Sequence, residues 1–134
     1  MKTLTLIQPW ATLIALKEKQ IETRSWKTNY RGQIAIHAGK KIDKTVFEDP
    51  FYINIFKKYG ITINNIPTSS IVAICDLTDC IHTEDILNNL TENEKKLGNY
   101  SPTRFAWILN NIQKLQEPIP AKGMLGLWEF SELK

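Results

Sequence analysis

The chain has 134 residues, a length that suits one domain with its own hydrophobic core. Apolar residues make up 43% and charged residues 23%, which excludes a disordered, collagen-like or disulfide-scaffold chain. The formal net charge is only +3, yet residues 1–44 hold nine basic and three acidic side chains. We therefore expect a single domain, 1–134, whose first third docks a polyanion or an anionic ligand, unless these charges scatter over several solvated faces.

In the first third of the chain, short strands surround one helix. Leu4 and Leu6 alternate with threonines, which is the pattern of a half-buried strand. Pro9 suits the first turn of a helix that runs to about Leu16. Two further strands are predicted over residues 21–26 and 33–38, separated by a turn at residues 28–32.

Beyond this region, helices are predicted in the connections between strands. Asp43 is expected to cap a helical stretch that Pro50 interrupts. Residues 70–82 carry the strongest strand signal, because they are dense in β-branched side chains. Thr91 and Glu94 form a capping box for a short helix. The last two predicted strands cover residues 105–109 and 125–130.

These elements predict an α+β fold, a small mixed barrel of five or six strands with short helices on its outside. Cys75 and Cys80 lie five apart in one strand, so we expect them on opposite faces, as reduced core residues without a disulfide. No run reaches the length of a membrane span and no signal peptide is recognised. The expected location is cytoplasmic, with no membrane partner.

Motifs for metals and cofactors are absent from the sequence. Gly39-Lys40 lacks the earlier glycine and the following hydroxyl of a phosphate-binding loop. Cys80 and His82 share a strand face, but no further nitrogen or sulfur ligand is fixed near them. We therefore expect neither a metal nor a cofactor.

A charged cluster follows the first predicted helix. Lys19 lies in the turn that leaves the helix, and Glu22 and Arg24 project from the next strand on one face. One interpretation is an exposed or partly exposed surface ion pair that contributes about 0–1 kcal/mol. The other is a cleft in which Lys19 and Arg24 hold a phosphate or carbonyl oxygen, while Glu22 accepts a proton or an amino group.

The segment ALKEKQIETRSW, residues 15–26, resembles the G-x-K-x-x-E-x-R signature of the ASCH (activating signal cointegrator homology) domain, a member of the PUA-like superfamily. Flanking segments agree in order: LIQPWA at 6–11, YRG at 30–32, IHA at 36–38, IVA at 71–73 and GLW at 126–128. The resemblance implies a PUA-like barrel with a cleft beside the first helix, lined by Lys19, Glu22 and Arg24. Lys17 stands where the family usually has Gly. The turn there either does without a positive φ or places a non-Gly residue in it, and an extra cation enters the site.

Members of this family are regarded as RNA-binding modules, so the resemblance implies binding of RNA or single-stranded DNA. The expected contacts are cationic and aromatic side chains of the first third, namely Lys17, Lys19, Arg24, Trp26, Lys27, Tyr30, Arg31, His37 and Lys40. Trp26 is the tryptophan expected to be exposed, whereas Trp10, Trp107 and Trp128 are expected to pack in the core. His37 is a lone imidazole on an apolar strand, and such a residue is more often a hydrogen-bonded structural residue than a base.

Two other functions stay open. Because a few family members are enzymes, the chain can also be a small hydrolase, either an amidohydrolase of modified cytidine, with a nucleoside as ligand, or a ribonuclease. Lys19, Glu22 and Arg24 are then the expected catalytic residues. The cytidine amidohydrolases have Thr where this chain has Glu22, so the hydroxyl expected for that chemistry is missing. The third function is a protein-interaction module with a vestigial cleft.

Overall fold

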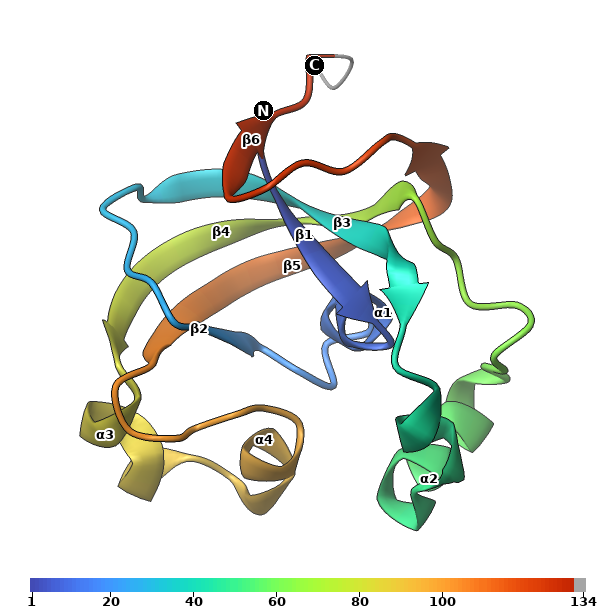
Figure 1. The fold of residues 1–134 in the computed structure, drawn as a ribbon, viewed down its shortest axis with the longest axis horizontal. Helices are drawn as coiled ribbons and strands as arrows, with labels where there is room; N and C mark the ends of the chain where they lie inside the picture. The colour runs from blue at the N-terminus through green and yellow to red at the C-terminus, as the bar shows by residue number, and fades with distance from the viewer. Residues whose placement is uncertain (132–134) are drawn as a thin grey trace.

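One curved, mixed sheet forms the body of the protein (Figure 1). The computed structural model describes residues 1–131, so the last three residues of the predicted 1–134 domain lie outside the described residues. The strand order is β2-β5-β4-β3-β1-β6, in which β1 and β3 are parallel and the other neighbours antiparallel. The strands are β1 (Lys2–Gln8), β2 (Ile21–Arg24), β3 (Gly32–Ile42), β4 (Ser70–His82), β5 (Phe105–Pro120) and β6 (Leu127–Glu129).

Short helices fill the connections, as expected for an α+β fold. They are α1 (Trp10–Ala15), the 3-10 helix η1 (Lys44–Glu48), α2 (Pro50–Tyr59), α3 (Thr83–Ile86), the 3-10 helix η2 (Leu87–Asn89) and α4 (Glu92–Lys96). Asp43 caps η1, and Asp49 caps α2 with Pro50 at its first position. The interruption predicted at Pro50 is therefore the junction between two helices. At α4 the hydroxyl of Thr91 accepts from the amide of Glu94 at 3.1 Å, which is one half of the predicted capping box. The Glu94 carboxylate accepts from the amide of Gln20 at 2.8 Å instead of from Thr91.

The α+β class and the mixed strand order agree with the prediction, but a closed barrel is not formed. Among the described residues, β2 pairs only with β5 and β6 only with β1, so the two edges of the sheet do not meet. Both edge strands are short, with four residues in β2 and three in β6. The sheet is therefore open and strongly curved (Figure 1).

Bulges between β4 and β5 explain two differences from the predicted strands. The register of this pair shifts at three places, which lets β5 continue to Pro120 although its apolar alternation stops near Leu109. One shift lies between Leu77 and Asp79 and inserts an extra residue on β4. Cys75 and Cys80 consequently face the same core cluster as free, buried thiols, so the prediction of opposite faces is wrong.

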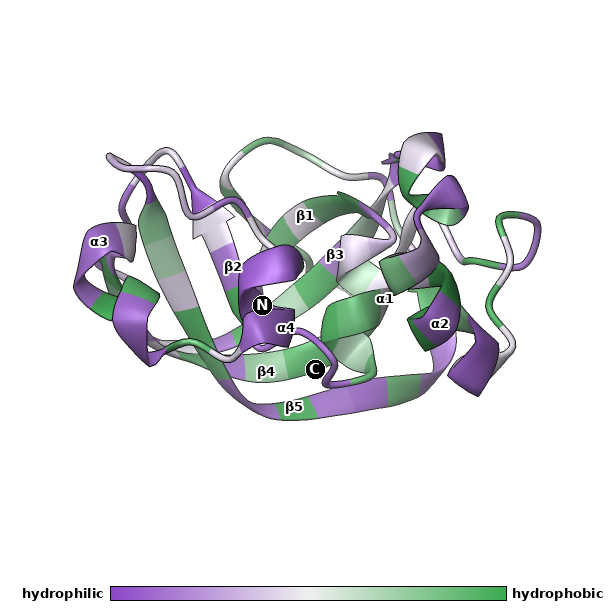
Figure 2. Cartoon of the chain, turned by 90° about the horizontal axis from the view of Figure 1, so that it is seen from below, coloured by the Kyte–Doolittle hydropathy of each residue, from purple (hydrophilic) through white to green (hydrophobic). Residues whose placement is uncertain are grey.

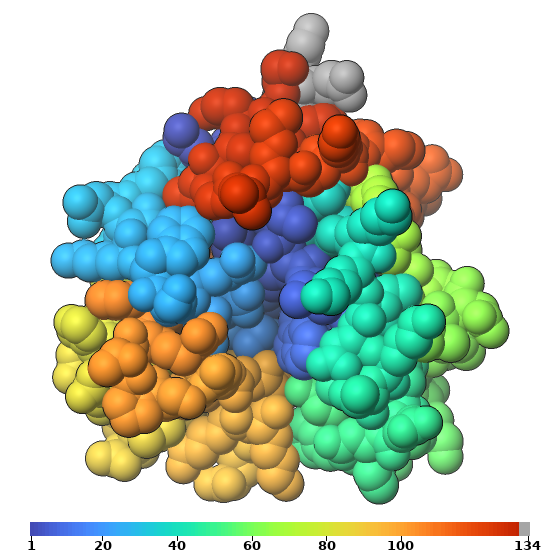
Figure 3. All heavy atoms as spheres, viewed as in Figure 1, coloured from blue at the N-terminus to red at the C-terminus, as the bar shows by residue number. Residues whose placement is uncertain are grey.

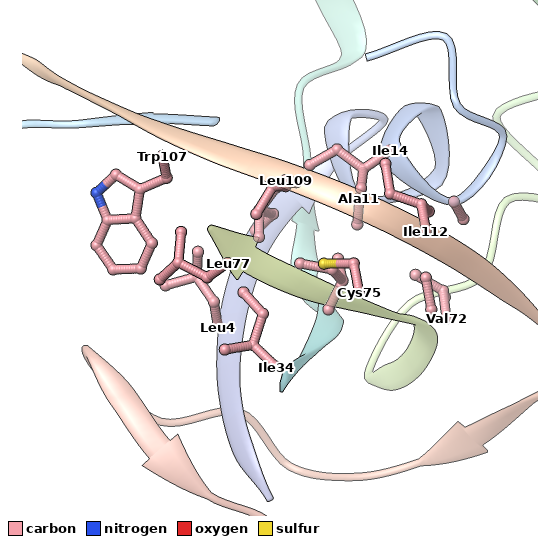
Figure 4. Packing of buried hydrophobic residues seen from close by; sticks show 14 of the residues in the cluster. Leu4, Ala11, Ile14, Ile34, Val72, Cys75, Leu77, Trp107, Leu109 and Ile112 are labelled. Carbon is pink, nitrogen blue, oxygen red and sulfur yellow. The ribbon is translucent and has the colours of Figure 1, made fainter. Parts of the chain in front are cut away.

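The main core lies between α1 and the concave face of the sheet. Leu4, Ile34, Leu77 and Trp107 are at most 1% exposed, and Ile14 of α1 packs against the same cluster (Figure 4). Figure 2 shows hydrophobic residues concentrated on α1 and on the strands beneath it, whereas α3 and α4 are largely hydrophilic. No helix within residues 1–131 is long and apolar enough to cross a membrane.

A second cluster fixes the helices at one end of the sheet. Leu13 of α1 packs with Tyr52 and Phe56 of α2, and with Leu97, which follows α4. Leu13 and Leu97 are at most 1% exposed. This cluster therefore holds α2 and the end of α4 on either side of the space in front of β1 and β2.

Candidate functional site

A cleft of about 580 Å³ opens where α2, α4, β1 and β2 meet. Its floor includes Thr5 and Ile7 of β1, and Trp10 and Tyr52 form an aromatic wall. Figure 3 shows this hollow at the centre of the face, where dark blue atoms from the start of the chain lie behind teal atoms from residues near 45 and orange atoms from residues near 100. The volume suits one small organic ligand.

Lys19 lies at the base of the cleft and is almost fully buried, with 1% of the residue exposed. Its Nζ donates to the carbonyl oxygen of Leu97 at 3.0 Å and lies 3.8 Å from Glu22 Oε1. Burial lowers the pKa of Lys19, while the negative charges of Glu22 and Glu94 oppose this shift. The expectation of an exposed or partly exposed cluster is therefore wrong for Lys19, which joins the turn before β2 to the segment after α4.

The backbone at Gly98 leaves room for this buried ammonium. A Cβ atom at Gly98 would lie 2.9 Å from Tyr100 Cε2 and 3.2 Å from Lys19 Nζ. The hydroxyl of Tyr100 and Oε2 of Glu94 are buried without a hydrogen-bond partner among residues 1–131. Burial raises the pKa of both side chains. The side of the cleft formed by α4 thus rests on a buried polar layer.

Glu22 and Arg24 complete the predicted trio beside Lys19. Arg24 Nε lies 3.3 Å from Glu22 Oε2, and the side chains are 25% and 14% exposed, respectively. Arg24 Nη2 donates to the carbonyl oxygen of Thr5 at 2.6 Å, so the guanidinium is held against β1. The structure therefore brings Lys19, Glu22 and Arg24 together in one cleft.

Arg104 also lines the cleft, and the sequence did not identify it. It precedes β5, and its Nη2 donates to the carbonyl oxygen of Thr23 at 3.0 Å. The two arginines become neighbours through the sheet, because Arg24 pairs with Phe105 in the β2–β5 register. A contact between residues 81 positions apart leaves no local sequence signal. For Nη1 of Arg24 and of Arg104, the described part of the chain supplies no hydrogen-bond partner.

Trp10 was expected in the core but is half-buried and faces the cleft. Its Nε1 donates to the hydroxyl of Tyr52 at 3.3 Å, and the two rings meet edge-on at 6.4 Å. The Tyr52 hydroxyl in turn donates to the carbonyl oxygen of Lys96 at 3.3 Å. The indole is therefore held in place by α2 and α4. Trp107 and Trp128 are buried, as expected.

Trp26 does not lie where the sequence placed it. It is half-buried, and its ring meets Trp107 edge-on at 4.8 Å. The prediction that Trp26 is exposed and shares a face with Glu22 and Arg24 is wrong, because β2 ends at Arg24 and the chain turns before Trp26. Trp26 is not among the residues that line the cleft.

His37 is a buried structural residue, 1% exposed. Its Nε2 lies 2.7 Å from the carbonyl oxygen of Ala121, and its Nδ1 lies 3.1 Å from Thr5 Oγ1. Because a carbonyl only accepts, Nε2 carries a proton and donates to Ala121. Burial prevents the predicted direct contact between His37 and nucleic acid.

The other predicted contacts lie outside the cleft. Lys17, Lys27, Arg31 and Lys40 are exposed, and Arg31 lies 3.5 Å from Asp79. Tyr30 is half-buried, packs against the main core and donates its hydroxyl to the carbonyl oxygen of Gln33. These side chains stay predicted contacts of a wider face.

Lys17 takes the left-handed backbone conformation, with φ of +65°. Its amide donates to the carbonyl oxygen of Ile14 at 2.9 Å, directly after the end of α1. Of the two alternatives for this turn, the chain therefore places a non-Gly residue at positive φ. The side chain points to another part of the surface, so no extra cation enters the cleft. Within residues 1–131, no group of three or more His, Cys, Asp or Glu side chains is arranged to hold a metal ion.

Comparison with known sequences identifies related proteins. Over 130 residues the chain is 27% identical to "Activating signal cointegrator 1" of Homo sapiens and equally to that of Mus musculus. The match covers 95% of this chain and 22% of each relative. The chain therefore spans about a fifth of the length of these relatives.

Comparison with solved structures gives the same fold. The crystal structure of ASCH from Zymomonas mobilis has a TM-score of 0.54 at 15% identity, covering 89% of this chain and 72% of that one. A point mutant of that protein gives a TM-score of 0.53, also at 15% identity, and covers 89% and 74%. The fold is PUA-like, as the resemblance implied. Residues 4–119 match the family model of the ASCH domain, and the chain belongs to that family.

Proposed function

We propose that this chain binds single-stranded RNA, with one nucleotide seated in the cleft. The observation that carries the proposal is the pair of arginines, Arg24 and Arg104, held by strand carbonyls at a cleft of nucleotide size. Each guanidinium donates from Nη2 to a backbone carbonyl, so Nη1 is available to a ligand. Guanidinium groups suit phosphate because their donors match its oxygens in a fixed geometry.

The aromatic wall supplies the second part of a nucleotide site. Trp10 is fixed by its hydrogen bond to Tyr52, and Ile7 beside it is 43% exposed. A base packs on such a surface whatever its sequence, because every base has an apolar π-face. The cleft thus offers cations for a phosphate and an aromatic ring for a base. Membership in a family linked to RNA binding supports the same ligand.

In this proposal, Lys19 and Glu22 have a supporting role. Lys19 is buried and already donates to Leu97, so it holds the side of the cleft formed by α4. Glu22 lies against Arg24 and orients its guanidinium. The contacts of the nucleotide then fall to Arg24, Arg104 and Trp10.

Binding of a fluorescent single-stranded RNA pool, followed by anisotropy over a range of salt concentrations, tests the proposal. The logarithm of affinity should fall with that of salt by about 0.7 per phosphate contact. Arg104→Ala should weaken binding about tenfold and reduce this slope. Arg31→Ala distinguishes the cleft from the wider basic face, because Arg31 lies outside the cleft and pairs with Asp79. It should weaken binding less than Arg104→Ala does.

Four results would contradict the proposal. No binding at low salt, or an affinity that does not change with salt, would show that the protein does not contact RNA phosphates. Equal losses in Arg104→Ala and Arg31→Ala place RNA on the wider basic face instead of in the cleft. If Arg104→Ala binds RNA as tightly as the wild type, the pair of arginines does not bind the phosphate.

A hydrolase is the second candidate, favoured by one observation. Lys19 is a buried lysine with a lowered pKa beside Glu22, an arrangement suited to proton transfer. Incubation with N4-acetylcytidine and chromatography of the released cytidine tests it. We expect weak or no turnover, because Glu22 stands where the cytidine amidohydrolases have Thr and the Leu97 carbonyl oxygen holds the ammonium of Lys19. Turnover at about 1–1,000 per second, lost in Glu22→Gln, would make the hydrolase the leading function.

A further inference from the structure

The connection between β5 and β6 presents two large apolar side chains to solvent. Met124 is 61% exposed and Leu125 is 97% exposed, the highest values among the large hydrophobic residues that the structure describes. Gly123 and Gly126 flank them, and Gly126 has a positive φ of +66°. We call Met124 and Leu125 the apolar tip.

The base of the apolar tip is firmly attached to the sheet. The amide of Ala121 donates to the carbonyl oxygen of Ser69 at 3.0 Å, and its own carbonyl accepts from His37 Nε2 at 2.7 Å. Gly123 packs so closely that a Cβ atom there would lie 2.8 Å from His37 Cε1 and 3.0 Å from Thr5 Oγ1. The base of the apolar tip is therefore held at a defined place, against His37 and Thr5.

That place is next to the cleft. Thr5 lines the cleft and accepts from Arg24 Nη2 through its carbonyl, and its hydroxyl lies 3.0 Å from the place that a Cβ atom on Gly123 would take. One residue thus separates the guanidinium from the base of the apolar tip. In Figure 3, red atoms from the last part of the chain border the hollow on its upper side. Lys122 adds a cation two residues before Met124.

We propose that the apolar tip packs against an unstacked base that adjoins the nucleotide in the cleft. This inference rests on the proposed function, because it extends the same RNA along the surface from Arg24. Apolar side chains such as Leu and Met are used as wedges that unstack neighbouring bases. Single-stranded RNA offers bases that are already free to splay onto such a surface. The ligand of the complete site is therefore an RNA of at least two nucleotides.

The test compares two probes, uridine 5′-monophosphate and an eight-nucleotide single-stranded RNA. The double variant Met124→Ser/Leu125→Ser should bind the eight-nucleotide RNA about tenfold more weakly than the wild type by anisotropy. Its affinity for the monophosphate, measured by NMR titration, should not change. Leu125→Trp should raise the affinity for the longer RNA, because an indole stacks on a base better than an aliphatic side chain.

Leu87→Ser is the matched control, because Leu87 is another exposed leucine, 37% exposed, and lies outside the cleft. It should leave both affinities unchanged. If the wild type binds neither probe, the proposed function itself fails, and this inference fails with it. If Arg104→Ala weakens RNA binding but the double variant binds as the wild type does, only the apolar tip is excluded. The inference is also wrong if the double variant loses affinity for both probes by the same factor.

Discussion

The ammonium of Lys19 donates to the carbonyl oxygen of Leu97 at 3.0 Å, across 78 positions of the sequence. Both residues are 1% exposed. Leu97 packs with Leu13 of α1 and Tyr52 of α2, so this hydrogen bond fastens the end of α4 to the turn that leaves α1. The side of the cleft that includes Leu97 and Gly98 depends on it.

Lys19→Met should therefore lower the free energy of unfolding by about 2 kcal/mol. The substitution keeps the volume but leaves the Leu97 carbonyl without its donor and the Glu22 carboxylate without one of its two cationic neighbours. Urea unfolding followed by circular dichroism measures the loss, with the exposed Lys27→Met as control. A change below about 0.5 kcal/mol would show that the bond does not hold the end of α4.

The short signature predicted part of the site, because its residues are close in sequence. Lys19, Glu22 and Arg24 lie within one turn and one strand, so local geometry is enough to group them. Arg104 joins them through the register of β2 with β5, which no spacing in the sequence reveals. The prediction for Trp26 was wrong because β2 ends two residues earlier than its alternating pattern indicates.

In the fold, too, local patterns were predicted correctly and long-range strand pairing was not. The predicted strand over residues 70–82 agrees with β4, since its β-branched residues are dense and its ends are marked by polar segments. β5 exceeds its prediction by eleven residues, up to Pro120, because bulged pairing with β4 takes the place of alternation. The common face of Cys75 and Cys80 has the same origin. Long-range pairing, which sets the register and the bulges, was not readable from local periodicity.

Glu94→Gln should change how stability depends on pH. Burial raises the pKa of Glu94 above its usual 4.5, although the amide of Gln20 and the charge of Lys19 favour the ionised form. A raised pKa in the folded state means that the folded protein binds more protons than the unfolded chain above pH 4.5. The stability contributed by this group is therefore full below pH 4.5 and falls as pH rises through the folded pKa.

Urea unfolding from pH 4 to pH 7 measures this effect. The fall in the free energy of unfolding above pH 4.5 should be smaller in Glu94→Gln, which keeps an oxygen to accept from Gln20 at 2.8 Å. Glu92→Gln is the control on the same helix, because Glu92 is exposed. If the free energy of unfolding depends on pH in the same way in the wild type and in Glu94→Gln, the raised pKa of Glu94 is not the cause.

Lys17→Gly should stabilise the protein by about 1 kcal/mol. Lys17 has a φ of +65°, a conformation that costs a residue with a Cβ atom about 1–2 kcal/mol, and part of this gain is lost to the greater freedom of glycine in the unfolded chain. Because Lys17 is exposed, little packing is lost. Thermal unfolding of Lys17→Gly beside Lys17→Ala separates the two causes, since alanine removes the side chain but keeps the strain. A gain in both variants would assign the effect to the lysine charge instead of the turn.

Trp26→Ala should separate stability from RNA binding. The Trp26 ring meets Trp107 edge-on at 4.8 Å and packs on the main core, so its removal should cost about 2–3 kcal/mol of the free energy of unfolding. Trp26→Phe keeps an aromatic edge against Trp107 and should cost less than about 1.5 kcal/mol. RNA affinity, measured well below the melting temperature of each variant, should stay at the wild-type value because Trp26 lies outside the cleft. If folded Trp26→Ala binds RNA more weakly while Trp26→Phe binds normally, an aromatic contact at this position belongs to the RNA site, and the bound strand extends from the cleft across the loop between β2 and β3.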